Sequence, residues 1–309
     1  MFASITKKSG LLFATSAFTI ACATTAIAEP VMVEHASGST EVAFNPNPTV
    51  AYDLAVIDTL HTLGVEVTGV PEGIWPDFLK KYEDDAKYPK VGTLFEPDYE
   101  AVFALDPELI IVAGRSAPKQ AELAKIAPTI DLTVVNGDLI NSVKKNTNTL
   151  AAIYSKQPQA EQALAKLDSA LAQINEHAAK VDNAMLILTV GGKISAYGPG
   201  SRFGIIHDAF GLPPTVENLE NTNHGQAVSL EFIYKNDPEW LFVIDRDAAI
   251  GTDSEAAQRL LDNELIHKTT AWKNKQIIYL DPVNWYILGS AGLNSLQQSI
   301  AEIDAAITK

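Results

Sequence analysis

Residues 100–115 read EAVFALDPELIIVAGR, and residues 231–246 read EFIYKNDPEWLFVIDR. The two segments align without a gap, so that a leading glutamate, an Asp-Pro-Glu triplet and a closing arginine recur at equal offsets. In each copy we expect a helix near the first glutamate, a turn at Asp-Pro-Glu, and a hydrophobic strand that runs into the arginine. The sequence therefore predicts one α/β unit that is used twice.

The closing arginines, Arg115 and Arg246, fall at the carboxyl ends of the two equivalent strands. Ligands of open parallel sheets bind at that edge. If the two units face each other, both arginines lie on the walls of one cleft. Two solvated loop arginines are the alternative, but the matched positions favour ligand contact.

A long helix is predicted between the two copies. From Gln159 to Lys180 the chain has leucine and isoleucine at helical spacing, and neither glycine nor proline interrupts it. Apolar β-branched runs alternate with helix-period segments on both sides, which is typical of α/β chains with mainly parallel strands. We expect a bilobal fold in which two α/β lobes, residues 29–154 and 182–309, are joined by a spine helix within residues 155–181, with the ligand cleft between the lobes.

The start of the chain is typical of an export signal. Lys7 and Lys8 precede an apolar run from Leu11 to Ala23, and small residues follow up to Ala28, so residues 1–28 are predicted to be a signal peptide that directs the protein to the periplasm. Cys22, the only cysteine, lies within this segment, and a lipid anchor at Cys22 is the alternative. No later stretch reaches the roughly 20 apolar residues of a membrane-spanning helix.

The charge of the chain excludes some partners. Removing the signal takes two lysines and no acidic residue from the 23 basic and 38 acidic residues, which leaves a formal charge of −17. A protein that binds nucleic acid through its phosphates needs the opposite balance. In so acidic a chain, a cluster of arginines in a cleft indicates an anionic ligand.

Three further residues in polar or turn-rich loops are candidates for ligand contact. Arg202 lies in the glycine-rich segment YGPGSRFG, His224 in NTNHGQ, and Tyr286 in DPVNWY. Imidazole nitrogen and phenolate oxygen both suit ferric iron. Taken singly, such residues are more often surface or packing residues, and their spacing shows no pairing.

The segments KISAYGPGSRFGIIHDAFG, NHGQAVSLEFI, NDPEWLFVIDR and NWY resemble the periplasmic binding proteins of catecholate siderophore importers, the enterobactin type, in the helix-spined class. The similarity extends through KYPKVGTLFEPDYEAVFALDPELIIVAGR, so it covers nearly the whole mature chain. The resemblance implies capture of a ferric catecholate siderophore and its delivery to an inner-membrane ABC permease, by a monomer without a permanently bound cofactor.

The resemblance also assigns roles to residues. Arg115, Arg202 and Arg246 offset the negative charge of the chelate, and His224 and Tyr286 complete the coordination of Fe3+ when the siderophore fills only four sites. Glu100 and Glu231 correspond to the acidic residues that dock onto the permease. The alternative for the two glutamates is a favourable interaction with the dipole of their own helices. Three aromatic residues, Trp75, Phe203 and Trp285, can either pack in the core or stack on catechol rings, and the sequence favours neither.

Three other functions are alternatives. The same class of protein can carry a hydroxamate siderophore, haem or cobalamin, although these cargoes do not require three arginines. An enzyme is disfavoured because the chain has no G-x-S-x-G, H-E-x-x-H or G-K-[ST] motif. A bare-metal site is disfavoured because the remaining histidines lie in unrelated contexts: His35, His61, His177, His207 and His267.

Overall fold

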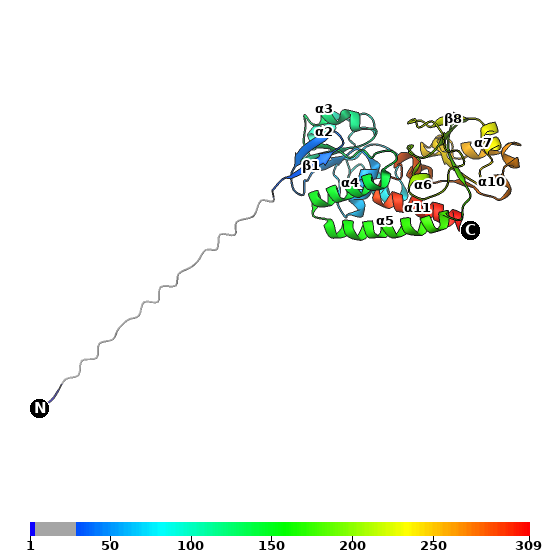
Figure 1. Cartoon of the computed structure of the whole chain (residues 1–309). Coiled ribbons are helices and arrows are strands. Elements are labelled where there is room, and N and C mark those ends of the chain that lie inside the picture. The colour runs from blue at the N-terminus through cyan, green and yellow to red at the C-terminus, as the bar shows by residue number, and fades with distance from the viewer. Residues whose placement is uncertain (4–28) are drawn as a thin grey trace.

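A computed structural model describes residues 1–3 and 29–309 of the chain. The predicted cleavage site and Cys22 lie outside the described residues. Figure 1 shows two halves side by side, with helices α5 (Gln157–Ala178) and α11 (Leu293–Ile307) running along their lower side.

The first half is built on a three-stranded parallel sheet. Its strands β3 (Thr49–Ala51), β4 (Leu109–Val112) and β5 (Thr129–Asp131) pair in chain order, and all of their residues are buried. Around the sheet lie the hairpin β1 (Val31–His35) and β2 (Gly38–Val42), and the helical segments α1 (Leu54–Thr62), η1 (Asp77–Glu83), α2 (Tyr99–Ala104), η2 (Ala117–Lys119), α3 (Gln120–Leu123) and α4 (Leu139–Tyr154).

The second half has a five-stranded mixed sheet in the order β10-β9-β6-β7-β8. Strands β6 (Ala184–Val190), β9 (Trp240–Asp245) and β10 (Ile277–Tyr279) are parallel, whereas β7 (Lys193–Tyr197) and β8 (Gln226–Val228) extend the sheet with antiparallel pairing. The accompanying helical segments are α6 (Ile205–Asp208), α7 (Leu230–Asn236), α8 (Arg246–Ala249), α9 (Ala256–Leu261), η3 (Ile266–Lys268), α10 (Thr270–Lys273) and the π-helical turn η4 (Val283–Ile287).

The repeated segments form equivalent units in detail. Asp98 caps α2 and Ser229 caps α7, two residues before the repeated glutamate in each case. The aspartates of the two Asp-Pro-Glu turns, Asp106 and Asp237, both have positive φ, at 46° and 43°. Each turn then leads into a strand, β4 or β9, that pairs in parallel with the first strand of its sheet. The helix, turn and strand predicted from the repeat are therefore present twice.

The helix predicted from Gln159 to Lys180 is α5, displaced by two residues at each end. Pro158 in its first turn is tolerated because the first amides of a helix have no intrahelical partner. The two halves share a second helical element, because α11 packs along α5 and also reaches α1 of the first half.

The contact between α1 and α11 depends on one buried carboxylate. Asp58 of α1 accepts hydrogen bonds from the backbone amides of Ser295 (2.7 Å) and Asn294 (3.3 Å), in the first turn of α11. A Cβ at Gly292 would overlap this carboxylate, so only glycine fits there. Burial raises the pKa of Asp58 to about 6, although the hydrogen bonds from Ser295 and Asn294 oppose the shift. We call this contact between α1 and α11 the seam between the two halves. It thus contains a carboxylic acid whose ionisation costs free energy.

The predicted α/β fold class is confirmed. Strand β3 ends at Ala51, and α1 begins soon after it, because the Asp53 side chain caps α1 by accepting hydrogen bonds from the amides of Ala55 and Val56. In each half, the two faces of the sheet pack against separate clusters of buried hydrophobic side chains. Leu288 of the second half packs into one of the clusters of the first half.

Candidate functional site

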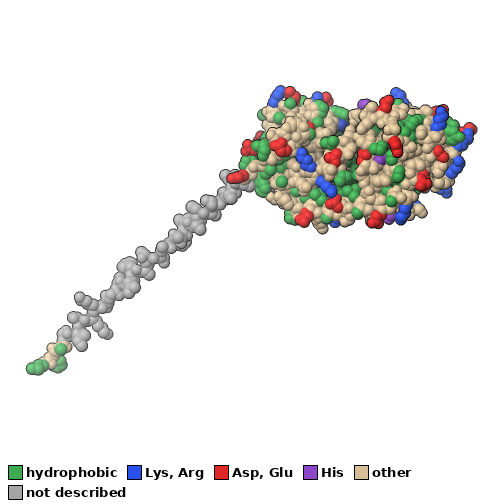
Figure 2. All heavy atoms as spheres, in the orientation of Figure 1, with side chains coloured by type: hydrophobic (Ala, Val, Ile, Leu, Met, Phe, Trp, Pro, Cys, Tyr) green, Lys and Arg blue, Asp and Glu red, His purple; other side chains and the backbone are tan. Residues whose placement is uncertain are grey.

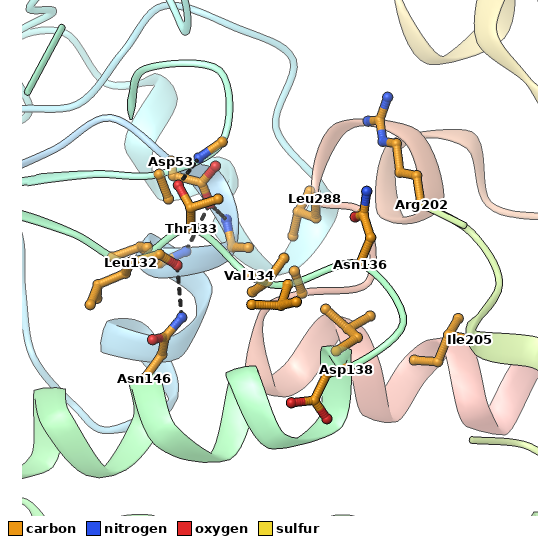
Figure 3. Close-up of a pocket in the computed structure, with 18 of the residues that line it drawn as sticks. Asp53, Leu132, Thr133, Val134, Asn136, Asp138, Asn146, Arg202, Ile205 and Leu288 are labelled. Atoms are coloured by element: carbon orange, nitrogen blue, oxygen red, sulfur yellow. Dashed lines mark hydrogen bonds between the residues drawn. The ribbon is translucent and has the colours of Figure 1, made fainter. Parts of the chain in front are cut away.

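A cavity of about 800 Å³ lies between the two halves. The first half lines it with the start of α1, the loop after β4 and the loop between β5 and α4. The second half contributes residues 201–209 and the segment after η4. Figure 3 shows Thr133 and Asn136 from the first half, and Arg202 and Ile205 from the second. The cavity is therefore at the carboxyl ends of the parallel strands, the edge that the sequence predicted.

Arg115, at the end of the first repeat, lines this cavity and reaches across to the second half. Its Nη1 donates to the carbonyl of Ile287 (3.0 Å) and its Nη2 to the carbonyl of Tyr286 (2.9 Å). These carbonyls end the short turn η4, where backbone acceptors lack helical partners. The side chain is thus held in place by backbone of the opposite half.

Arg202 and Arg246 approach the same tyrosine from the second half. Arg202 Nη2 donates to the Tyr286 carbonyl (3.0 Å), and Arg246 Nε donates to the Tyr286 hydroxyl (2.7 Å). Burial lowers the pKa of Arg202, and the nearby charge of Arg115 adds to the shift. Guanidinium groups remain charged in spite of such shifts, so the site concentrates positive charge.

Tyr286 is the centre of this arrangement. The guanidinium carbons of Arg115, Arg202 and Arg246 lie 5.6, 5.1 and 5.4 Å from its ring centroid. Burial alone would raise the pKa of the phenol, but the hydrogen bond from Arg246 and the charges of all three arginines outweigh burial and lower it. The three arginines therefore make the Tyr286 phenol more acidic, and they favour a ligand of negative charge.

His224 is not part of this cluster. It is exposed in the turn before β8, and no hydrogen bond to its ring occurs among the described residues. The adjacent Asn223 lines the cavity, so the loop lies at its mouth. The structure thus brings four of the five predicted ligand residues together and leaves His224 on the loop. Arg246 and Tyr286 adjoin the cavity without lining it.

The three aromatic residues considered for stacking are core residues. Trp285 is fully buried and donates from its indole nitrogen to Glu302 (2.8 Å). Phe203 is 1% exposed and packs edge-on against Tyr197. Trp75 is 3% exposed and packs on another aromatic ring. Of the two alternatives for these rings, packing in the core is therefore the one that the structure shows, because none of the three rings lines the cavity.

Other lining residues gave no motif in the sequence. The loop from Leu132 to Asp138 forms much of the wall of the first half. In this loop Gly137 meets Gly200 of the opposite half, where a Cβ would come within 3.2 Å of the Gly200 Cα, so the two loops touch at the rim. Phe95, which is 57% exposed, also lines the cavity. The position of this loop directly after a buried strand was the available signal.

Glu100 and Glu231 are both exposed, each in the first turn of its helix. Figure 1 places α2 and α7 in the upper part of the two halves, on the side away from α5 and α11. The helix position agrees with a dipole interaction. It also leaves both carboxylates available to a partner on one side of the molecule.

Surface charge is dispersed on the face shown in Figure 2, where acidic and basic side chains are interspersed over both halves. Among the described residues, no group of three or more histidine, cysteine or acidic side chains could hold a metal ion. No helix within this part of the chain is long and apolar enough to cross a membrane.

The family model described as periplasmic binding protein matches residues 49–283, more than half of the chain. The chain belongs to the periplasmic binding protein family. The resemblance drawn from the sequence is confirmed at this level. Proteins of this family bind and deliver substrates, so this periplasmic binding protein is not an enzyme.

Two curated relatives have names that state their cargo. Petrobactin-binding protein YclQ of Bacillus subtilis is 40% identical over 286 residues, which cover 91% of this chain and 89% of the relative. Ferric-anguibactin-binding protein FatB of Vibrio anguillarum is 31% identical over 279 residues, with 89% and 86% covered.

Solved structures agree with the fold of this periplasmic binding protein. The crystal structure of YclQ matches with a TM-score of 0.88 over 91% of this chain and all of the other. The periplasmic catecholate-siderophore binding protein VctP of Vibrio cholerae is 32% identical, with a TM-score of 0.84 over 90% of this chain and all of VctP.

Proposed function

We propose that this protein captures an anionic ferric siderophore of the catecholate type in the periplasm and delivers it to an inner-membrane ABC permease for iron uptake. The observation that carries the proposal is the convergence of Arg115, Arg202 and Arg246 on Tyr286 beside the cavity between the halves. In this proposal the lobes 29–154 and 182–309 hold the ligand between them, and residues 155–181 join the lobes.

The charge of the cargo follows from its chemistry. Each catecholate supplies two negative oxygens, so a ferric complex with two or three catecholates is anionic. Three guanidinium groups with planar donor arrays suit such oxygens. Because the carbonyls of Tyr286 and Ile287 already hold Arg115 and Arg202, the ligand meets an arranged site and loses less free energy to ordering.

We propose Tyr286 and His224 as the residues that ligate Fe3+ when the siderophore offers only four donors. The lowered pKa of Tyr286 supports the tyrosine, because a phenolate is a hard ligand for ferric iron. His224 lies on an exposed loop beside the lining residue Asn223, so the loop has to bring the imidazole inward. Iron is the cargo here and not a resident cofactor.

The relatives support an iron chelate as cargo. The printed names of YclQ, FatB and VctP refer to petrobactin, ferric anguibactin and a catecholate siderophore. A protein named for hydroxamate binding, FhuD of Bacillus subtilis, is only 25% identical. Hydroxamate siderophores, haem and cobalamin therefore remain as alternative cargoes for a binding experiment.

We propose that the protein is a monomer that is released after cleavage of residues 1–28, with a lipid anchor at Cys22 as the alternative. The permease is proposed to receive Glu100 and Glu231, one from each half. Charge reversal at both positions, Glu100→Arg with Glu231→Arg, should reduce uptake of the chelate by cells and leave its affinity for the purified protein unchanged. Normal uptake by this variant would contradict the docking proposal.

The cargo proposal is tested by absorption spectroscopy and fluorescence titration with ferric bis-catecholate. We expect saturable quenching of tryptophan fluorescence, and a charge-transfer band that changes in Tyr286→Phe and in His224→Ala. His267→Ala, which removes a partly exposed histidine paired with Asp262, is the matched control and should keep the wild-type spectrum. Unchanged spectra in both site variants would show that Tyr286 and His224 do not ligate iron directly. Tight binding only to a neutral cargo would overturn the catecholate proposal.

A further inference from the structure

Each half of the molecule presents an exposed aromatic ring one helical turn after its repeated glutamate. Phe103 follows Glu100 on α2 and is 72% exposed, and Tyr234 follows Glu231 on α7 and is 42% exposed. Residues three apart on a helix lie on the same face, so each glutamate and its ring form one surface unit. The buried residues Val102 and Ile233 precede the two rings and anchor the helices.

The two rings occupy equivalent positions in the repeated unit. Caps, turns and strands correspond in both copies, and the equivalence extends to Glu108 and Glu239 of the two Asp-Pro-Glu turns. Glu108 accepts from the amide of Asn47 (2.9 Å), and Glu239 accepts from the amide of Asp182 (2.7 Å). Each of these amides lies two residues before the first strand of its sheet. Phe103 and Tyr234 therefore have the same relation to their lobes.

We propose that Glu100 with Phe103 and Glu231 with Tyr234 form two docking units, and that the membrane subunits of the importer receive each unit in a socket that combines a cation with an apolar floor. The proposal rests on the proposed delivery function and adds the apolar part of the contact. Exposed aromatic rings are enriched at protein interfaces and contribute more binding free energy than surface charges at a rim.

The chemistry of the partner follows from the duplication and from charge. Two copies of one surface unit fit two copies of one complementary surface, which a partner built from two like subunits provides. In the described part of the chain, neither glutamate is paired with a cation in a salt bridge, so both carboxylates are available. A bare lipid surface is disfavoured because anionic headgroups repel carboxylates.

The test uses Phe103→Ala, Tyr234→Ala and the double variant. Fluorescently labelled protein is sedimented with membrane vesicles prepared from iron-limited cells that contain the importer, and with protein-free vesicles made from the same lipids. We expect the double variant to bind the importer vesicles roughly 10- to 100-fold more weakly than the unaltered protein, with each single variant in between. Phe44→Ala, which removes a ring that is 40% exposed in the segment between β2 and β3, outside α2 and α7, is the matched control and should bind as the unaltered protein does.

The outcomes separate this proposal from the cargo proposal. Titration with ferric bis-catecholate should give the same affinity for all variants, which also shows that they are folded. Loss of vesicle binding with unchanged cargo affinity supports the docking units. The docking units are overturned if the double variant binds importer vesicles as strongly as the unaltered protein does. They are also overturned if the unaltered protein binds protein-free lipid vesicles as strongly as importer vesicles. If the unaltered protein does not bind ferric bis-catecholate at all, the cargo proposal fails while the vesicle result still decides the docking units.

Discussion

The two halves of the molecule repeat one helix, turn and strand, but they contribute unequally to the cleft. After β9 the second half supplies Arg246, and it adds Arg202 and Tyr286 from segments that have no counterpart in the repeat. The first half supplies Arg115 and a mostly apolar wall. Duplication thus accounts for Arg115 in the cavity wall of the first half and for Arg246 beside the cavity in the second half, whereas most of the positive charge at the site belongs to the second half.

This difference suggests that the two halves contribute differently to ligand binding. In the proposed function, the second half would hold the anionic centre of the ligand, and the first half would contribute Arg115. The seam on the opposite side, where Asp58 caps α11, sets how the halves are joined.

Removing both arginines of the second half, Arg202→Ala with Arg246→Ala, should weaken binding of ferric bis-catecholate at least about 100-fold. A hydrogen bond to a charged group contributes about 1.5–3 kcal/mol, and about 1.4 kcal/mol corresponds to a factor of ten. Fluorescence titration measures the change. Arg259→Ala, an exposed arginine paired with Asp253 and Glu255, should bind normally. If the double variant keeps its affinity for ferric bis-catecholate, the second half is not the main binding site for the anion.

The seam should respond to pH through Asp58. Because the pKa of folded Asp58, about 6, lies above its ordinary value, the folded protein binds more protons than the unfolded chain in the window between them. The stability that this group contributes is present below the window and is lost as the pH rises through it. From pH 4 to 7 the unfolding free energy of the wild type should fall by about 1–3 kcal/mol relative to Asp58→Asn.

Chemical denaturation of both proteins at several pH values measures this difference. Asp98→Asn, at the exposed cap of α2, controls for loss of a capping charge. If the difference in unfolding free energy between the wild type and Asp58→Asn stays constant with pH, ionisation of the buried carboxylate does not destabilise the seam.

Removing the single arginine of the first half should have the smallest effect on affinity. We expect Arg115→Ala to weaken binding of ferric bis-catecholate about tenfold, the loss of one charged hydrogen bond. Arg115→Lys keeps the charge but cannot reach both the Tyr286 and Ile287 carbonyls, so it should recover only part of the loss. A loss as large as that of the Arg202/Arg246 double variant would make the two halves equal partners.

The sequence predicted those features that depend on local pattern. The repeat predicted the matched helices, turns and strands, and the uninterrupted leucine spacing predicted α5 to within two residues. It also placed Arg115 and Arg246 at strand ends, because a parallel sheet has only one edge at which its strands end.

Features that depend on distant segments could not be read from the sequence. Arg202 and Tyr286 are 84 residues apart, and their hydrogen bond depends on how η4 packs. The packing of Trp285 in the core depends on Glu302 of α11, a half-buried residue that accepts the hydrogen bond from the indole nitrogen. Likewise, nothing near Asp58 in the chain indicates that it caps a helix that begins more than two hundred residues later.

The central claim is that arginines of both halves surround one anionic iron chelate beside Tyr286. Anomalous diffraction at the iron edge, from crystals grown with ferric bis-catecholate, tests this claim most directly. We expect a single iron peak in the cleft, in the space between Arg115, Arg202 and Arg246 and next to the phenolic oxygen of Tyr286. An iron peak elsewhere in the cleft, or on an outer surface remote from these arginines, would contradict it.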